Sequence, residues 1–171
     1  MLIIRDSARL VACGVVALAA LLSSSSATWA QTAVILVRHA ERADQSTDSL
    51  LSPAGAERAK ALARALATAG VKQIYVSKFQ RTQLTAAPLA AALKLTPEVV
   101  DAATSAPIVE RIRRDHANDV VLVVGHSNTV PALIKDFGHP DPVTIADDEF
   151  DSLFILFPRG TAAPSVLRIR Y

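Results

Sequence analysis

Short runs of β-branched and leucine residues, separated by helix-forming segments, constrain the fold of this chain more than any other feature. Residues 33–37 form an unbroken Ala-Val-Ile-Leu-Val run, and similar runs occupy residues 73–77 and 119–124. Continuous apolar runs of this length are typical of strands that helices cover on both faces. Helices are predicted between and after them, at residues 54–69, 81–93, 106–116 and 128–137. The alternation therefore predicts an α/β fold in which most strands are parallel.

The C-terminal part of the chain has a different pattern. Two apolar runs, at residues 152–157 and 166–169, are separated by Pro158-Arg159-Gly160. Two short runs joined by a turn of this composition predict a pair of antiparallel strands. A short extended piece is also expected at residues 96–100.

The N-terminal 30 residues have the pattern of a secretory signal peptide. Arg5 and Arg9 precede an uncharged apolar stretch at residues 10–22, and small residues stand before a predicted cleavage after Ala30. The stretch is shorter than the roughly 20 residues of a membrane-spanning helix, so an uncleaved anchor is the weaker alternative. We therefore expect residues 31–171 to form one exported domain, periplasmic or secreted, with no stable membrane span.

The single cysteine, Cys13, falls within this predicted signal peptide. The letters around it match a lipoprotein processing site, but too little apolar chain precedes it to support export. We therefore interpret Cys13 as part of the apolar core of the signal peptide. The predicted domain then has no cysteine, which excludes disulfides and thiol catalysis in it.

The charge of the chain is close to neutral, at +2 overall. A near-neutral protein gives no reason to expect nucleic-acid binding through bulk charge. The one local basic cluster is formed by Arg111, Arg113 and Arg114, on a predicted helix that also carries Glu110 and Asp115. Mixed charges of this kind are typical of a solvated helix face.

Basic residues follow three of the predicted strands. Arg38 and His39 come directly after residues 33–37, Arg81 lies shortly after the second run, and His126 closely follows the third. In open α/β sheets, ligands bind beyond the carboxyl ends of the strands. Two arginines and two histidines that converge there predict a site for an anion, with phosphate as the best candidate.

These residue types suit phosphoryl transfer. The neutral imidazole of His39 is a good nucleophile toward phosphorus when its other ring nitrogen is held by a hydrogen bond. The guanidinium groups of Arg38 and Arg81 can each bind two phosphate oxygens, and a protonated His126 donates to a third. A helix that begins directly after His126 adds N-terminal amides, which makes Ser127 a further candidate phosphate contact.

Each of these residues also has a simpler interpretation. A single His or Arg after a strand is more often a capping or surface residue, and His116 and His139 are interpreted in this way. The basic residues at the three strand ends would have a structural role if their charges paired with Asp44, Asp48 or the acidic group at residues 147–149. Their joint occurrence at three strand ends makes this the weaker interpretation. The acidic group is expected to form a solvated turn, because a negative lid would repel an anion.

Three motifs resemble those of the histidine phosphatase superfamily, the phosphoglycerate-mutase-like group. Arg38-His39-Ala40-Glu41 is similar to the Arg-His-Gly signature of that family. The second and third motifs resemble Ser77-x-x-x-Arg81-Thr82-x-x-Thr85-Ala86 and Gly125-His126-Ser127. The three motifs follow the family's order and span most of the predicted domain.

The resemblance implies a three-layer α/β/α fold with a mostly parallel central sheet. It implies that His39 is transiently phosphorylated and that Arg38, Arg81 and His126 hold the phosphoryl group. It implies no metal ion and no cofactor. The expected function is that of a phosphatase acting on a small phosphorylated substrate or a phosphoprotein, by hydrolysis of a phosphomonoester or phosphoramidate.

The chain departs from the family pattern in two places. Ala40 stands where the family has glycine, which is tolerable if the φ angle there is negative. The segment from residue 85 to residue 120 has no clear acidic motif for protonating the leaving group, so Asp101 and Glu110 are the candidates for the general acid. A missing acid favours phosphoramidates and activated phosphates over alkyl monoesters. The alternative is a non-catalytic phosphate-binding module of the same fold.

Overall fold

The fold is built on one six-stranded sheet with helices on both faces. The computed structural model describes residues 33–101, 103–159 and 162–171. The predicted signal peptide and Cys13 lie outside these residues. The strands are β1 (Ala33–Arg38), β2 (Val71–Ser77), β3 (Glu98–Val100), β4 (Val120–Gly125), β5 (Ser152–Arg159) and β6 (Ala162–Arg170). The helices are α2 (Pro53–Leu66), α3 (Gln80–Leu93), α4 (Ala106–Asp115) and α5 (Thr129–Asp136).

The strand order across the sheet is β3-β2-β4-β1-β5-β6. The first four strands in this order are mutually parallel, whereas β5 runs antiparallel to β1 and β6 antiparallel to β5. This arrangement confirms the predicted α/β class and the mostly parallel sheet. The C-terminal strands are longer than the apolar runs from which they were predicted, because pairing continues beyond those runs as far as Arg159 and Ala162.

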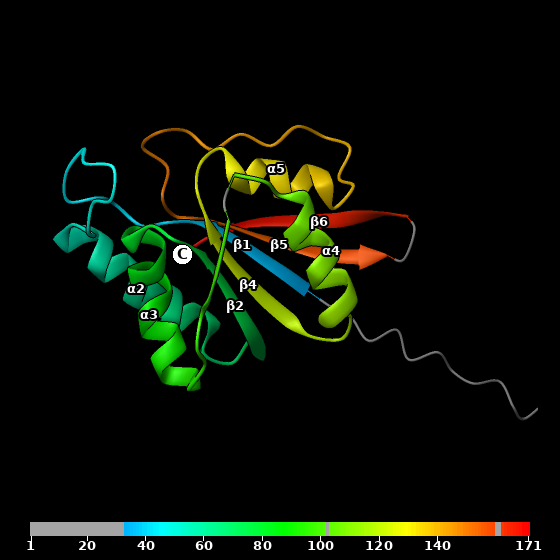
Figure 1. Cartoon of the computed structure of the whole chain (residues 1–171), viewed down its shortest axis with the longest axis horizontal. Coiled ribbons are helices and arrows are strands. Elements are labelled where there is room, and N and C mark those ends of the chain that lie inside the picture. Colours follow the sequence, from blue (N-terminus) through cyan, green and yellow to red (C-terminus); the bar gives the residue numbers. More distant parts are fainter. Residues whose placement is uncertain (1–32, 102, 160–161) are drawn as a thin grey trace, which may run out of the picture.

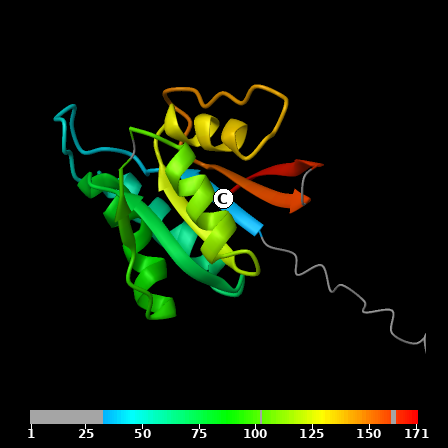
Figure 2. The same ribbon diagram turned by 45° about the vertical axis from the view of Figure 1, so that its right-hand side comes forward.

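The four helices form two layers, with α2 and α3 on one face of the sheet and α4 and α5 on the other (Figures 1 and 2). Strand β1 lies in the middle and is buried along its whole length. Its side chains alternate between the two layers: Val34 and Leu36 join the α4–α5 core, while Ile35 and Val37 join the α2–α3 core. Burial on both faces explains why the strand is apolar at every position rather than at every second one.

Helix α2 begins as its sequence predicts. The hydroxyl of Ser52 accepts a hydrogen bond from the backbone N–H of Gly55 at 3.0 Å, and Pro53 takes the first helical position. A Cβ at Gly55 would overlap the backbone carbonyl of Glu41, so only glycine permits this approach. The first turn of α2 is therefore packed directly against the segment that follows β1, where the predicted catalytic histidine lies.

No helix among the described residues is both long enough and apolar enough to cross a membrane.

Candidate active site

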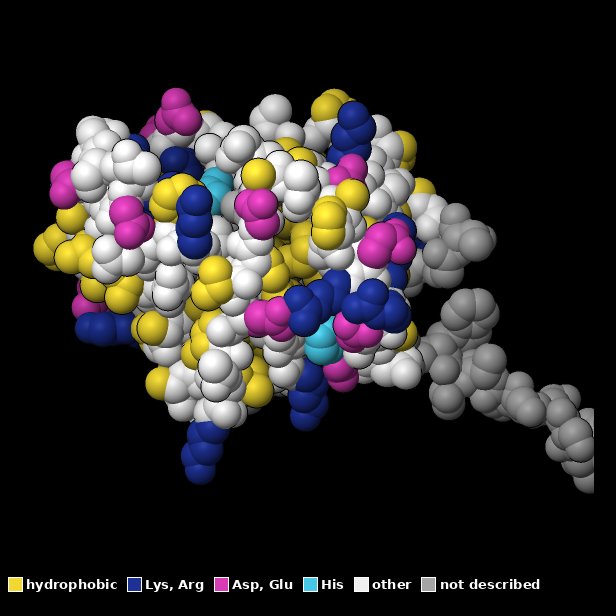
Figure 3. Space-filling view, viewed as in Figure 1, with side chains coloured by type: hydrophobic (Ala, Val, Ile, Leu, Met, Phe, Trp, Pro, Cys, Tyr) yellow, Lys and Arg dark blue, Asp and Glu magenta, His cyan; other side chains and the backbone are white. Residues whose placement is uncertain are grey.

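A cavity of about 530 Å³ opens at the carboxyl ends of β1, β2 and β4. Because these strands are parallel, their ends meet at one edge of the sheet, and the chain that follows each strand reaches the same place. All five residues predicted as the nucleophile or as phosphate contacts line this cavity: Arg38, His39, Arg81, His126 and Ser127. Figure 3 shows a histidine at the upper left, with Lys or Arg side chains beside it.

Arg38 is the last residue of β1 and is only 8% exposed. Its Nη1 donates to three backbone carbonyls, those of Ala146 at 2.8 Å, Asp147 at 3.0 Å and Glu149 at 3.1 Å. Its guanidinium carbon lies 4.0 Å from the centre of the Phe150 ring. These contacts fix the guanidinium from one side. Burial lowers the pKa of Arg38, although the nearby Asp147 acts in the opposite direction.

The acidic group forms a turn at Asp147 and Asp148, and both residues are exposed, as predicted. The prediction did not include the contact of this turn with the site. Residues 146–149 pack onto the site and present backbone carbonyl oxygens to Arg38. The Glu149 carboxylate turns away to Arg168 and Ser152, while Asp147 also lines the cavity. The expected repulsion is avoided mainly because the segment approaches through its backbone rather than through all of its carboxylates.

His39 is buried, and its Nδ1 lies 2.8 Å from the backbone oxygen of Ala40. A carbonyl can only accept, so Nδ1 carries the proton and Nε2 keeps its lone pair. Burial lowers the pKa of His39 from its ordinary value of 6.5 to about 3. The nearby charges of His126, Arg81 and Arg38 lower this pKa further, against the effect of the Ala40 hydrogen bond. The ring is therefore neutral at physiological pH, with one fixed nitrogen and one free nitrogen.

His126 faces His39, with 5.2 Å between the ring centres. Its Nε2 lies 3.1 Å from the hydroxyl of Ser77 at the end of β2, and its backbone N–H donates to Thr129 Oγ1 at 2.8 Å. Burial, together with Arg81 and Arg38, lowers the pKa of His126 to about 4. The ring is thus held in place as a neutral group while the cavity contains no anion.

Arg81 lies in the first turn of α3 and stacks on Phe79, with its guanidinium carbon 4.3 Å from the ring centre. Its Nη1 donates to the backbone oxygen of Thr47 at 2.8 Å. The Nε atoms of Arg81 and Arg38 are buried and have no hydrogen-bond partner among the described residues. Buried donors without partners are costly. Both arginines line the cavity, where an oxyanion can accept from guanidinium N–H groups.

The first two motifs are joined by one threonine. Thr85 Oγ1 accepts from the backbone N–H of Ala40 at 2.9 Å and donates to the backbone oxygen of Arg81 at 2.6 Å. Ala40 is fully buried and does not have a positive φ angle, so the methyl group that replaces the family's glycine is accommodated. The next residue, Glu41, forms a bidentate ion pair with Arg58 on α2. The motif segments are thus held together independently of any ligand.

The two candidates for the general acid are separated in space. Asp101, just after β3, lines the cavity with His39. Its carboxylate accepts a hydrogen bond from the backbone N–H of Ala103 at 2.9 Å. Glu110 does not reach the cavity: it is an exposed residue of α4 that pairs with Arg113 at 3.1 Å. Of these two candidates, the structure therefore brings Asp101 to the cavity and not Glu110.

Several cavity residues were not singled out from the sequence. Arg42 and Lys78 lie one residue beyond the Arg-His-Ala-Glu motif and one residue beyond β2, respectively. Their positions next to the strand ends are a signal that could have identified them. Asp147 carries no comparable signal, because its place depends on how the long segment between α5 and β5 folds back.

The structural interpretation of the basic residues fails on the observed contacts. Within the described part of the chain, Arg38 and Arg81 form no salt bridge; their protein partners are backbone carbonyls. Asp48 instead accepts from Gln80, and Asp44 from the backbone N–H of Ser46. His116, by contrast, is bound to Asp119 and Tyr75, as expected for a structural histidine.

A smaller pocket of about 180 Å³ adjoins the cavity between the sheet and helices α4 and α5. Both hollows are lined by Asp101, Ala103, Asn128 and Thr129. Across residues 33–101, 103–159 and 162–171, no group of three His, Cys, Asp or Glu side chains is placed to hold a metal ion.

Comparison with protein families finds one match. Residues 34–104 match the model of the histidine phosphatase superfamily (branch 1). This range contains the first two motifs and Asp101. A comparison with curated proteins finds no match.

Several solved structures share the fold. The protein histidine phosphatase SixA complexed with tungstate has a TM-score of 0.68 and 17% identity, with 81% of this chain and 96% of that chain covered. A mycobacterial glucosyl-3-phosphoglycerate phosphatase has a TM-score of 0.64 and 16% identity, with 81% and 97% covered. A phosphoserine phosphatase from Entamoeba histolytica, in complex with 3-phosphoglyceric acid, has a TM-score of 0.65 and 15% identity, with 82% and 97% covered. At these identities the likeness concerns the fold.

Proposed function

We propose that this chain, whose residues 34–104 match the model of the histidine phosphatase superfamily (branch 1), is a phosphatase that works through a phosphohistidine formed on His39. The observation that carries this proposal is the state of the His39 ring. Nδ1 of this ring carries the proton and donates a hydrogen bond to the backbone oxygen of Ala40. The pKa of the ring is lowered to about 3, so Nε2 is an unprotonated nucleophile at neutral pH.

In the first step, the lone pair of His39 Nε2 forms a bond to phosphorus while the bond from phosphorus to the leaving oxygen or nitrogen breaks. The leaving atom takes the bonding electrons and a proton. Arg38 and Arg81 bind the equatorial oxygens, where charge accumulates during phosphoryl transfer. Their guanidinium N–H groups supply donors for those oxygens. In the second step, water attacks phosphorus, the N–P bond breaks, and inorganic phosphate and neutral His39 are released.

His126 and Ser127 complete the phosphate contacts in this proposal. The neutral His126 ring has one N–H, and its Nε2 is already paired with Ser77. A phosphate dianion favours the protonated ring, since an opposite charge nearby raises the pKa of a histidine. The bound ring then donates to Ser77 through Nε2 and to a phosphate oxygen through Nδ1. Ser127, at the same strand end, lines the cavity beside it.

We assign the general acid to Asp101, the candidate carboxyl group that lines the cavity. It donates a proton to the leaving atom in the first step and takes one from water in the second. General acid catalysis contributes about 10²–10⁴-fold for a poor leaving group and less for a good one. Asp101→Asn should therefore slow an alkyl phosphate far more than an aryl phosphate or a phosphoramidate. Equal losses on all three substrates would remove Asp101 from this role.

The decisive test is direct detection of the intermediate. The protein is mixed briefly with a radiolabelled aryl or acyl phosphate and quenched in alkali. We expect an alkali-stable, acid-labile label that His39→Ala lacks and that Arg64→Gln, a variant of an exposed residue on α2, retains. Phosphate binding without any label or turnover would instead support the alternative, a non-catalytic phosphate-binding module.

The substrate class stays within phosphomonoesters and phosphoramidates. The structural neighbours are named as phosphatases of a protein histidine, of a phosphorylated sugar acid and of phosphoserine, so this fold serves both kinds of bond. We also propose that residues 1–30 direct export and are removed. N-terminal sequencing of the mature protein would check this, with a start at Gln31 expected and an intact Met1 contradicting it.

A further inference from the structure

Two more cations share the cavity with the proposed phosphate-binding residues. Arg42 and Lys78 line it together with Arg38 and Arg81. They come from different strand ends, since Arg42 follows β1 and Lys78 follows β2. Their exposure differs from that of the residues around the nucleophile: Arg38, His39 and His126 are buried, whereas Arg42 is half-buried and Lys78 exposed. They therefore stand toward the open side, where the leaving group of a bound phosphate must lie.

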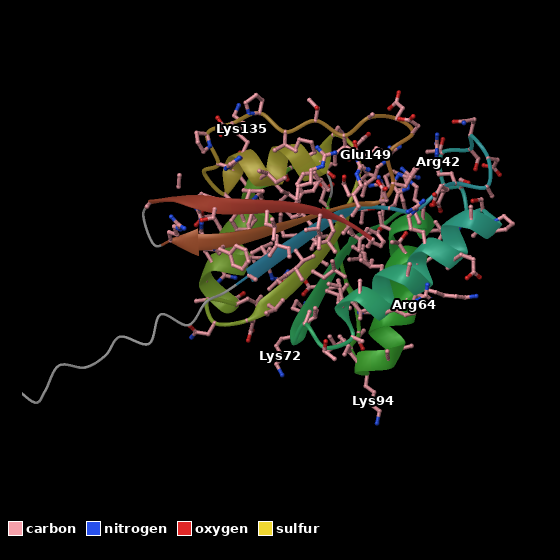
Figure 4. The ribbon with its side chains drawn as sticks, turned by 180° about the vertical axis from the view of Figure 1, so that it is seen from behind. Arg42, Arg64, Lys72, Lys94, Lys135 and Glu149 are labelled. Atoms are coloured by element: carbon pink, nitrogen blue, oxygen red, sulfur yellow. The ribbon has the colours of Figure 1, made fainter. Side chains whose placement is uncertain are left out.

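The backbone of Arg42 is fixed rather than loose. Arg42 forms an isolated antiparallel bridge with Leu51, and the backbone N–H of Ala43 donates to Leu50 at 2.9 Å. Its guanidinium donates to Gln45 Oε1 at 2.6 Å, a neutral partner. In the view of Figure 4, Arg42 and Glu149 lie in the upper part of the molecule, and Lys72 and Lys94 lie at the bottom. Hydrogen bonds from Ser46 and, to a smaller degree, the charge of Arg42 lower the pKa of the exposed Asp44, but among the described residues Arg42 forms a salt bridge with no carboxylate. Its hydrogen-bonded partner is therefore neutral.

Lys78 is also without a carboxylate partner. In the described part of the chain it forms no salt bridge, and its Nζ lies 5.6 Å from the centre of the Phe79 ring. Phe79 also stacks with Arg81, so one aromatic ring positions two cations beside the cavity. Most other arginines have acidic partners: Arg58, Arg111, Arg113, Arg114, Arg168 and Arg170 all form salt bridges.

The carboxylates of the cavity do not neutralise these two cations. Of the two that line it, Asp147 lies close enough to Arg38 to affect its pKa, and Asp101 is the proposed general acid. Arg42 also lies close enough to Arg38 and Arg81 that its charge lowers the pKa of both. Like charges held together in this way are unfavourable in the empty protein, and an anion between them relieves the repulsion.

We propose that Arg42 and Lys78 form a second anion subsite, so that the preferred substrate is a small molecule with a second phosphate or carboxylate group beside the scissile phosphate. This inference rests on the proposed function for the identity of the first site. A cavity of about 530 Å³ has room for more than one phosphate group. A phosphate monoester without a second charge would fill only the buried end and leave these two cations unused.

Matched substrates give the first test. The kcat/KM of the protein is measured for propyl phosphate, for propane-1,3-diol bisphosphate and for 4-phosphooxybutanoate at fixed ionic strength. We expect the doubly anionic substrates to be preferred by roughly 10- to 100-fold, the range typical of a charge-assisted contact. The bisphosphate and the carboxylate distinguish which second anion fits. A ratio near two for the bisphosphate, which is the statistical factor for its two ends, would overturn the proposal.

Variants then show which residues cause the preference for doubly anionic substrates. The double variant Arg42→Gln/Lys78→Gln should lose most of this preference, and the charge-preserving Arg42→Lys should retain most of it. Arg64→Gln is the matched control, because Arg64 is an exposed arginine on α2 (Figure 4). A preference that survives in the double variant would place the second anion elsewhere and contradict this assignment. Thermal unfolding checks that each variant is folded.

Binding without turnover separates this inference from the proposed function. Calorimetry compares propylphosphonate with propane-1,3-diyl bisphosphonate, neither of which can be hydrolysed. We expect the bisphosphonate to bind at least 10-fold more tightly to the wild type and to lose that advantage in Arg42→Gln/Lys78→Gln. If no phosphate ester is hydrolysed but this difference is found, the catalytic proposal fails and the subsite stands. Equal affinities would overturn the subsite, whatever the enzyme hydrolyses.

Discussion

The arginines of helix α4 and those at the carboxyl ends of the strands carry the same charge in opposite surroundings. On α4, Arg111 pairs with Glu98, Arg113 with Glu110 and Arg114 with Asp115. Arg113 and Arg114 are exposed, and Arg111 is half-buried. In the α4 region of Figure 3, basic and acidic side chains lie side by side. At the strand ends, Arg38 and Arg81 have no carboxylate bound to them among the described residues, and each holds a buried Nε without a partner.

The arginines of α4 have charges that are solvated and paired, whereas Arg38 and Arg81 have charges that remain available to a ligand. Exposed ion pairs contribute little to stability and can be replaced at small cost. Buried cations without counter-ions destabilise the folded chain, and they persist where a function requires them. The basic cluster that is densest in the sequence is therefore the less informative one, whereas the cations scattered over three strand ends mark the site.

The largest expected effect is on catalysis. Arg81→Gln should lower kcat/KM for an aryl phosphate by about 10²–10³-fold, because it removes a donor aimed at charge that develops in the transition state. Arg113→Gln should change it by less than about twofold. Steady-state kinetics on the two variants makes the comparison directly. Similar losses in both would show that the strand-end cations have no special role.

Ligand-induced stabilisation should show the next largest effect. An anion that binds only the folded state at 100 times its Kd stabilises it by about 2.7 kcal/mol. We expect phosphate to raise the melting temperature of the wild type and of Arg113→Gln alike, and to raise that of Arg81→Gln much less at the same concentration. Calorimetric scans at increasing phosphate measure this. An undiminished shift in Arg81→Gln would place the anion at another site.

The pH dependence of stability should reveal the buried His39. Its folded pKa is about 3 against 6.5 in the unfolded chain, so between these values only the unfolded state takes up the proton. Stability is therefore lost as the pH falls below 6.5, by up to about 1.4 kcal/mol per pH unit for this group. Urea unfolding from pH 7 to pH 4.5 should show a shallower loss for His39→Gln than for the wild type or Arg113→Gln. Parallel curves would mean that His39 titrates normally.

The smallest effect is expected within the α4 network itself. A double-mutant cycle on Glu110 and Arg113 should give a coupling free energy of no more than about 0.5 kcal/mol, decreasing further in 0.5 M salt. Denaturant unfolding of Glu110→Gln, Arg113→Gln and the double variant measures this value. A coupling above about 1.5 kcal/mol would show that exposure is a poor guide to the importance of a charge in this protein.

The fold was largely predictable from the sequence because the central strands contain apolar runs that alternate with helix-forming segments. Residues 33–37 predicted β1 to within one residue, and Ser52-Pro53 marked the first turn of α2. The full length of β5 and β6 was not predictable, because both strands extend through proline, alanine and polar residues, and backbone pairing does not require large apolar side chains.

The positions of Arg38, His39 and His126 were predictable because these residues lie at, or directly after, the ends of strands. The sequence could not show which of Asp101 and Glu110 lies at the cavity, because this depends on the path of the chain between β3 and α4. The lowered pKa of His39 was not predictable either, since burial of the ring is a property of the folded environment. The placement of residues 146–149 depends on tertiary packing alone, and no local pattern in the sequence encodes it.

Because three backbone carbonyls outside the motifs hold Arg38, a segment that contains only the three motifs lacks part of the site. All three motifs lie before residue 128, and a chain ending after α5 would contain every one of them. Such a chain would lack Ala146, Asp147 and Glu149, the residues that fix the guanidinium next to the nucleophile. The segment between α5 and β5 is therefore held to one length and one path by its backbone contacts to Arg38, a constraint that lies outside all three motifs.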